Sequence, residues 1–294
     1  MKRETSRGLA PVTVLCATFG LSTAAFYAAK KASESPDARK EKSRSPRRGF
    51  ATVEQILAAV RKVLAEFPSW GVRKVWSILR REHGLVVSRK RVWAVMSAHG
   101  LVLLKEREHH EAPPRGHVGV PEPNRRFATD GTFVWTTLDG WVSLVPTIDC
   151  GCRSILGMVV SKAQDATTWL RSLREALRAA FGSPAKVPRG LELRTDHGAQ
   201  FTSTEAKKLA TTWRLEHTFA PKGRPTGNSI VERVIRTLKE ELLWTRDWAD
   251  ADEVAEAVRE WMERYNRRRP HQSLGWSTPA EYRASRLDPA PVAA

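Results

Sequence analysis

Residues 126–161 read RFATDGTFVWTTLDGWVSLVPTIDCGCRSILGMVVS, and they hold three apolar stretches rich in β-branched and aromatic residues. Turn signals separate these stretches at Leu138-Asp139-Gly140 and at Cys150-Gly-Cys-Arg153. This pattern predicts three consecutive strands that meander back and forth. The predicted strands are Arg126 to Val134, Trp141 to Asp149 and Ser154 to Ser161.

Beyond these strands the hydrophobic period alternates between the helical and the strand type. Trp169, Leu170, Leu173 and Leu177 recur at helical spacing, for example. Three strands followed by alternating helices and strands predict an α/β protein with an RNase H-like mixed sheet flanked by helices. The further predicted elements are helices 165–181, 203–212, 228–244 and 250–265, and strands 191–196 and 217–220.

Three acidic residues stand where this fold would bring them together. Asp130 lies in the first strand, Asp196 ends the fourth, and Glu232 lies in the first turn of a long helix. The first and fourth strands are neighbours in such a sheet, so the two aspartates would lie side by side beneath the glutamate. Clustered carboxylates need a shared cation, and their hard oxygens suit Mg²⁺ or Mn²⁺. We therefore expect Asp130, Asp196 and Glu232 to be catalytic and to hold metal, with two ions serving phosphodiester chemistry.

Each acid alone also fits a structural role. Asp130-Gly131 and Asp196-His-Gly198 have the composition of simple turns. Glu232 suits the positive end of a helix dipole. The functional interpretation depends on the three acids occurring together.

The sequence around the acids resembles that of DDE transposases from bacterial insertion sequences with two reading frames, which have a retroviral integrase-like core. The 35 residues between Asp196 and Glu232 match the spacing of that superfamily. The resemblance implies a transposase that cleaves DNA strands and joins them through this carboxylate triad. It covers about residues 9–282, and the matching motifs are RTDHGAQF (194–201), GNSIVER (227–233), RTLKEELLW (236–244), YNRRRPHQSL (265–274) and TPAEY (278–282).

The sequence departs from these relatives in three ways. Many of them follow the first aspartate with a β-branched or apolar residue, whereas Gly131 follows Asp130 here, so Asp149 on the second strand remains an alternative. The zinc-binding His/Cys module of retroviral relatives has no counterpart. In the two-frame elements the upstream frame supplies a DNA-binding and multimerising segment, which implies a possible partner of this chain.

Basic and polar residues near the triad are candidates for contacts with DNA or for support of the acids. Arg236 and Lys239 follow Glu232 at i+4 and i+7, on the face of the acid. Each basic residue alone also fits a solvated surface charge. The other candidates are Lys222, Arg224, Arg267, Arg268 and Arg269 for DNA, and His197, Gln200 and Asn228 for support.

Residues 51–104 have the pattern of three short helices joined by tight turns, which predicts a helix-turn-helix domain. The third helix opens with Arg89-Lys90-Arg91 after a capping Ser88, where a recognition helix meets DNA. An ordinary three-helix bundle is the alternative. The remaining predicted segments are a small helical element (1–32), a basic linker (33–50), a second linker (105–124), the catalytic domain (125–284) and a flexible tail (285–294).

Uncharged residues 8–29 follow a basic start and mimic a signal peptide or membrane span. Pro11 and Gly20 interrupt this run, and Ser and Thr residues dilute its hydrophobicity, so a small helix-turn-helix explains it better. We expect no membrane association.

The charge balance points to nucleic acid. Lys and Arg number 49 against 32 Asp and Glu, which gives a net charge of +17. The three cysteines are too few for a disulfide framework and fit a reducing cytoplasm, and Cys150-Gly-Cys152 is too closely spaced for a zinc pair. We expect a cytoplasmic, nucleoid-associated protein that binds element ends and target DNA, and that forms a homo-oligomer because two ends must meet.

Three other functions remain open. Tyr265, with Arg264, Arg267 to Arg269 and His271, superficially resembles the residue set of a tyrosine recombinase, although these residues are crowded into one segment. A DNA-binding regulator that has lost catalysis and a general RNase H-type nuclease are the other two. The acid triad argues against the regulator, and the added DNA-binding segment argues against the nuclease.

Overall fold

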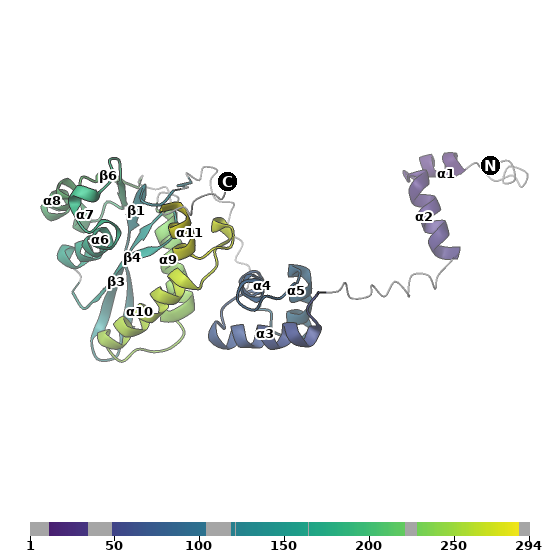
Figure 1. Cartoon of the computed structure of the whole chain (residues 1–294), viewed down its shortest axis with the longest axis horizontal. Helices are drawn as coiled ribbons and strands as arrows, with labels where there is room; N and C mark the ends of the chain where they lie inside the picture. The colour runs from purple at the N-terminus through teal and green to yellow at the C-terminus, as the bar shows by residue number, and fades with distance from the viewer. Residues whose placement is uncertain are drawn as a thin grey trace, which may run out of the picture. The chain divides into compact units, whose positions relative to one another are not determined.

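The computed structural model of the chain forms two compact units, Met1–Phe50 and Ala51–Ala294, coloured along the chain in Figure 1. The predicted linker 105–124 and the tail 285–294 lie largely outside the part that the structure describes. The described residues are 12–34, 49–103, 119–120, 122–163, 165–220 and 228–287.

The first unit contains two short helices, α1 (Val12–Thr18) and α2 (Thr23–Glu34). The turn between them contains Gly20, whose φ of 63° suits a residue without a Cβ. Ser22 Oγ accepts a hydrogen bond from Ala25 N at 3.1 Å and so caps α2. Neither these helices nor the others in the described ranges are long and apolar enough to cross a membrane.

The second unit begins with three helices, α3 (Val53–Glu66), α4 (Val72–Arg81) and α5 (Arg89–Ala98). A capping box between Thr52 and Gln55 starts α3, and Ser88 Oγ caps α5. Their apolar faces form one cluster of buried residues. The largest of its fully buried side chains are Trp70, Ile56, Ile78, Leu79 and Met96.

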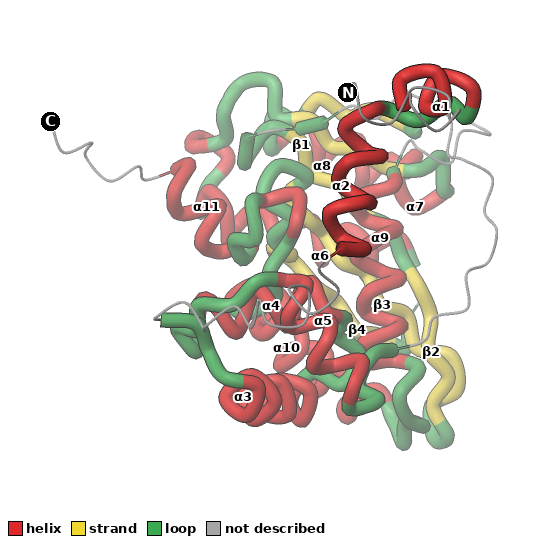
Figure 2. Tube along the Cα trace, turned by 90° about the vertical axis from the view of Figure 1, so that its right-hand side faces the viewer, coloured by secondary structure: helices red, strands yellow, loops and turns green. Residues whose placement is uncertain are grey.

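The sheet that follows has six strands. The central strand β3 pairs antiparallel with β1, β2 and β4, whereas β5 pairs parallel with both β1 and β6. Figure 2 shows the strands in yellow. Their bounds are β1 (Arg126–Thr129), β2 (Thr132–Thr136), β3 (Gly140–Asp149), β4 (Ile155–Ser161), β5 (Glu192–Thr195) and β6 (Glu216–Phe219).

The first predicted strand is interrupted after Thr129. Both β1 and β2 pair with β3 in one unbroken register, from Phe127 opposite Asp149 to Thr136 opposite Gly140. They are therefore two halves of one long strand, and only Asp130 and Gly131 leave the ladder. The same register sets Asp130 opposite Pro146, which has no N–H to donate, and this explains the break.

Helices cover both faces of the sheet, with α6, α7 and α8 on one side and α9, α10 and α11 on the other (Figure 1). Each side has its own apolar core: Leu144 and Val234 belong to the α9 and α10 side, and Phe127 and Leu173 to the α6 and α8 side. The predicted class, a mixed α/β sheet flanked by helices and preceded by a helical region, is confirmed. The bounds are α6 (Ala166–Phe181), α7 (Ala199–Thr202), α8 (Thr204–Thr212), α9 (Ser229–Leu238), α10 (Ala251–Arg267) and α11 (Pro279–Leu287).

Candidate active site

Asp130 lies in the gap between β1 and β2, and its side chain is half-buried. Its Oδ1 accepts a hydrogen bond from Gly131 N at 2.8 Å. The pKa of Asp130 lies above its ordinary value because burial and the negative charge of Asp196 raise it more than the Gly131 hydrogen bond and the charge of Lys239 lower it. An approaching cation would therefore stabilise this carboxylate.

Asp196 directly follows β5, and its side chain is exposed. Because β5 runs parallel to β1, Asp130 and Asp196 leave the sheet at the same edge. Asp196 Oδ1 accepts a hydrogen bond from Gly198 N at 2.9 Å, which shapes the turn. Thr195 Oγ1 donates to the Asp196 carbonyl at 2.9 Å and lies 2.9 Å from His217 Nε2, so β6 supports the backbone of this turn.

Glu232 lies in the first turn of α9 with its side chain on the exposed face. Val231, Val234 and Leu238 on the other face pack into the core beneath. Burial raises the pKa of Glu232, and the charge of Asp130 raises it further. The charge of Asp196 thus acts on Asp130, and the charge of Asp130 acts on Glu232.

Asp130 thus interacts electrostatically with both other acids, and it forms no salt bridge with a described residue. Within the described ranges, no three His, Cys, Asp or Glu side chains converge closely enough to hold a metal ion as they stand. The donor set itself consists of hard carboxylate oxygens, which suit a divalent cation such as Mg²⁺. The chemistry of the site therefore fits the predicted metal, and the triad as its ligands stays a prediction.

The three predicted supporting residues all lie beside the acids. Asn228 is buried, and its Nδ2 donates to the carbonyl of Thr129 at 3.4 Å, next to Asp130. Among the described atoms, its buried Oδ1 has no hydrogen-bond partner. Gln200 folds back over Gly198, and His197 stacks on the ring of Phe219 with 4.9 Å between centroids.

Packing against a neighbouring helix requires a glycine at position 131, which the sequence alone does not show. A Cβ at this position would lie 2.1 Å from the ring of Trp169, a buried residue of α6. That ring packs edge to face with Phe201, which belongs to α7 just after Asp196. One aromatic pair thus links the backbone at Asp130 with the turn at Asp196. The helical spacing of Trp169 predicted only a core residue.

Asp149, the alternative first aspartate, has a different environment. Its side chain is fully buried, and Oδ2 accepts hydrogen bonds from Asn124 N and from Arg283 Nη1, both at 2.7 Å. Its Oδ1 accepts another from Gly151 N at 2.8 Å. Because both of its carboxylate oxygens accept hydrogen bonds inside the protein, Asp149 is suited to stabilising the fold and not to binding a metal ion.

The predicted DNA-contact residues fall into three groups. Arg89 and Lys90 are exposed at the start of α5, with Arg91 half-buried beside them, and the exposed Trp93 lies one turn on, a neighbour that the sequence reasoning missed. Lys222 and Arg224 lie outside the described residues. The others make contacts within the protein: Arg236 pairs with Glu240, Arg267 with Glu263, Arg268 with Glu66 and Glu82, and Arg269 with Glu241, while Lys239 lies over Trp244.

Tyr265 and the cysteines are buried. Burial raises the pKa of Tyr265 to about 12, and the guanidinium of Arg269 lies over its ring. A buried phenol with so high a pKa is a poor nucleophile, which argues against a tyrosine recombinase. Cys150 and Cys152 are free thiols, and burial raises the pKa of Cys150 to about 12.

Comparisons with known families identify two kinds of domain to which parts of the chain are similar. Residues 120–225 and 198–279 each match a family model described as "Integrase core domain". Residues 52–109 match one described as "HTH-like domain". The two core matches together contain all three acids, and they overlap at residues 198–225.

Individual proteins are also similar to the chain. The transposase InsD of insertion element IS2A/D/F/H/I/K from Escherichia coli is 28% identical over 237 residues, which are 77% of each protein. A chain of a simian T-cell lymphotropic virus intasome is 20% identical, with a TM-score of 0.49, over 80% of this chain and 78% of that one. The catalytic core of HTLV-2 integrase, solved with magnesium, is 17% identical over 55% of this chain and 97% of that one, with a TM-score of 0.42. The resemblance inferred from the motifs is confirmed.

Proposed function

We propose that this protein, a transposase of the integrase-core kind, cleaves the ends of an insertion sequence and joins them to target DNA through Asp130, Asp196 and Glu232. The observation that carries the proposal is the placement of two of these acids at the same ends of neighbouring strands, with the third in the first turn of α9. Asp130 and Asp196 leave neighbouring parallel strands at one edge, and the charge of Asp130 raises the pKa of Glu232. Such an arrangement suits two divalent cations, probed as Mg²⁺ or Mn²⁺.

The chain's own residues would position the reacting groups. A bound divalent cation would supply Lewis acidity and a deprotonated attacking oxygen. The sheet would position Asp130 and Asp196 at the ends of β1 and β5, whereas Glu232 approaches from the first turn of α9. Asn228 would support the backbone beside Asp130 through its hydrogen bond to the Thr129 carbonyl. Lys239, whose charge reaches Asp130, can neutralise a DNA phosphate.

The helices α3 to α5 would bind the element ends. Arg89, Lys90 and Arg91 open α5 in the place of a recognition helix, and the exposed Trp93 extends that surface. We further propose the boundaries 51–104 for this domain and 125–284 for the catalytic domain. A homo-oligomer would bring two DNA ends together in the cytoplasm, at the nucleoid, and the upstream-frame product of the same element is a possible partner.

The test is strand transfer on a labelled duplex that carries the element's end, in Mg²⁺, in Mn²⁺ and in EDTA. We expect metal-dependent joining by the wild type and loss of joining in Asp130→Asn, Asp196→Asn and Glu232→Gln, with end binding retained. Asp149→Asn, at temperatures where it stays folded, is the matched control and should keep joining. Joining that persists in any of the three variants would remove that residue from the triad. Binding without any cleavage by the wild type would favour a DNA-binding regulator.

A further inference from the structure

The helix that carries Glu232 continues beyond α9. A π-helical turn, Lys239–Leu243 (η4), follows Leu238 directly, and Glu241 lies within it. The two glutamates are nine positions apart, or about 14 Å along a helix at 1.5 Å per residue. π-Helical turns are rare and often occur at functional sites. Glu232 and Glu241 thus lie near opposite ends of one continuous helical segment, Ser229–Leu243.

Glu241 forms a buried ion-pair cluster with two cations from different parts of the chain. Lys74 Nζ of α4 lies 2.9 Å from its Oε1, and Arg269 Nε donates to the same oxygen at 3.1 Å. The side chains of Glu241, Arg269 and Lys74 are only 12%, 13% and 24% exposed. Burial alone would raise the pKa of Glu241, but Arg269 and Lys74 hold it below its ordinary value.

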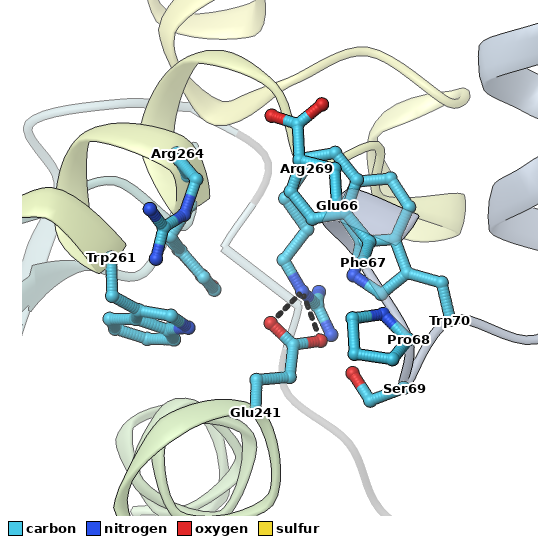
Figure 3. Close-up of a pocket in the computed structure, with 10 residues that line it drawn as sticks. Glu66, Phe67, Pro68, Ser69, Trp70, Glu241, Trp261, Arg264 and Arg269 are labelled. Carbon is cyan, nitrogen blue, oxygen red and sulfur yellow. Dashed lines mark hydrogen bonds and ion pairs between the residues drawn. The ribbon is translucent and has the colours of Figure 1, made fainter. Parts of the chain in front are cut away.

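Figure 3 shows how this cluster is enclosed. The guanidinium of Arg269 points at the Glu241 carboxylate, between Trp261 of α10 on one side and Phe67 and Trp70 on the other. Phe67 and Trp70 stack with 3.9 Å between their centroids and belong to the segment that joins α3 to α4. The cluster therefore lies where the helix-turn-helix domain meets the catalytic domain.

The other contacts between the two domains involve a different part of the catalytic domain. Arg73 donates to Gln272 at 3.0 Å, Arg81 donates to the carbonyl of Trp276 at 2.8 Å, and Arg268 donates to Glu82 at 2.8 Å. On the catalytic domain all of these contacts fall within residues 268–281, after α10. The contact of Lys74 with Glu241, by contrast, reaches the helix that carries Glu232.

We propose that Glu241 is a positioning residue, through which the docked helix-turn-helix domain holds α9 and thereby sets Glu232 over Asp130 and Asp196. The inference rests on the proposed function, because it assigns Glu232 to the metal site. Lys74 and Arg269 bind Glu241 at the C-terminal end of this helical segment. A shift of the helix-turn-helix domain on DNA would therefore move Glu232 at its N-terminal end. The C-terminal motif at 265–274 then serves as a docking surface for that domain through Arg268, which pairs with Glu66 and Glu82.

The test compares Lys74→Met, Lys74→Arg and Glu241→Gln with Arg73→Met in the full chain. Arg73 is the matched control because it crosses the same domain boundary from the same helix but contacts Gln272 instead of Glu241. Three quantities are measured: Mn²⁺ binding by electron paramagnetic resonance, kcat and KM of strand transfer, and affinity for end DNA.

For Lys74→Met and Glu241→Gln we expect Mn²⁺ binding and kcat to fall about fivefold or more, the lower end of typical coupling between sites, with KM and end affinity unchanged. Lys74→Arg should restore most of the loss, and Arg73→Met should match the wild type. Equal losses in Arg73→Met and Lys74→Met, or no loss in Lys74→Met, would overturn the inference.

Hydrogen exchange of the α9 amides separates this inference from the proposed function. Lys74→Met should speed exchange across Ser229–Leu238 whether or not the acids bind metal. If Glu232→Gln binds Mn²⁺ as the wild type does, the proposed metal site fails. If exchange over α9 is the same in Lys74→Met and the wild type, the positioning role of Glu241 fails.

Discussion

Two aspartates at opposite ends of the paired strands β1 and β3 have opposite environments. Asp149, opposite Phe127 at the start of β1, is fully buried and pairs with Arg283 at 2.7 Å. Asp130, at the other end of β1, is half-buried, pairs with no cation at salt-bridge distance among the described residues, and is repelled by Asp196. The first carboxylate is neutralised by the fold itself, whereas the second keeps an unbalanced charge. Unbalanced charge at an accessible strand edge is what a site for an incoming cation requires.

The largest effect that would test this comparison is on stability. Asp149→Asn leaves the partly buried Arg283 without its charged partner, so we expect a loss of about 3 kcal/mol in the free energy of unfolding. Asp130→Asn removes repulsion and should leave that free energy unchanged or raise it. Glu263→Gln, which breaks the exposed pair with Arg267, is the control and should cost at most about 1 kcal/mol. Urea unfolding measures the free energy for all three variants. Equal losses for the two aspartate variants would contradict the claim that the two carboxylates have opposite environments.

The packing beside Asp130 gives the next effect. Gly131→Ala would push the Trp169 ring away and displace the strand break, and a misplacement of about 1 Å can cost on the order of a hundredfold in rate. We expect strand transfer to fall accordingly while end binding is retained. A Cβ at Gly71 meets no atom within 4 Å, so Gly71→Ala serves as the control. Wild-type rates in Gly131→Ala would show that the contact with Trp169 does not position Asp130.

Metal binding should stabilise the protein through the site at Asp130 and should not involve Asp149. At a Mg²⁺ concentration ten times its Kd, we expect the wild type to gain about 1.4 kcal/mol in stability. Asp130→Asn should gain much less, whereas Arg267→Gln, far along α10, should gain as much as the wild type. Thermal unfolding with and without Mg²⁺ measures the difference. An equal gain in Asp130→Asn would place the metal elsewhere.

The smallest expected effect is on the pH dependence of stability. The pKa values of Asp130 and Glu232 are raised in the folded state, so this state binds more protons than the unfolded chain does. Stability without metal should therefore decline as pH rises from about 4, the ordinary carboxyl pKa, through the raised values. The decline should be shallower in Asp130→Asn. Melting temperatures in EDTA across this window provide the measurement, and parallel curves would contradict the assigned repulsion.

The sequence predicted the sheet and the placement of the acids well because both depend on local patterns. Alternating apolar residues marked the strands, and the 35-residue spacing related Asp196 to Glu232. The break at Asp130 and Gly131 was not predicted, because it depends on Pro146 across the sheet and on the ring of Trp169. The predicted strand through 134 therefore appears as two.

The long-range ion pairs could not be predicted. Arg268 and Arg269 are found in one basic run, and sequence alone gave them the same role as any exposed arginine. Their partners Glu66, Glu82 and Glu241 lie up to 202 residues away along the chain, where no spacing rule applies. The π-helical turn at 239–243 was likewise read as ordinary helix, since its residues keep an apolar face.

The unbroken register of β1 and β2 on β3 has a consequence for how this site can change. Side chains of β2 alternate strictly, with Val134 in the core and Phe133 and Trp135 exposed. One residue added or removed between Thr129 and Thr132 would exchange these faces and turn two large aromatic rings into the α9 and α10 core. The strand register therefore fixes the number of residues between Thr129 and Thr132 at two. Variation there can proceed by replacement of residues but not by change in their number.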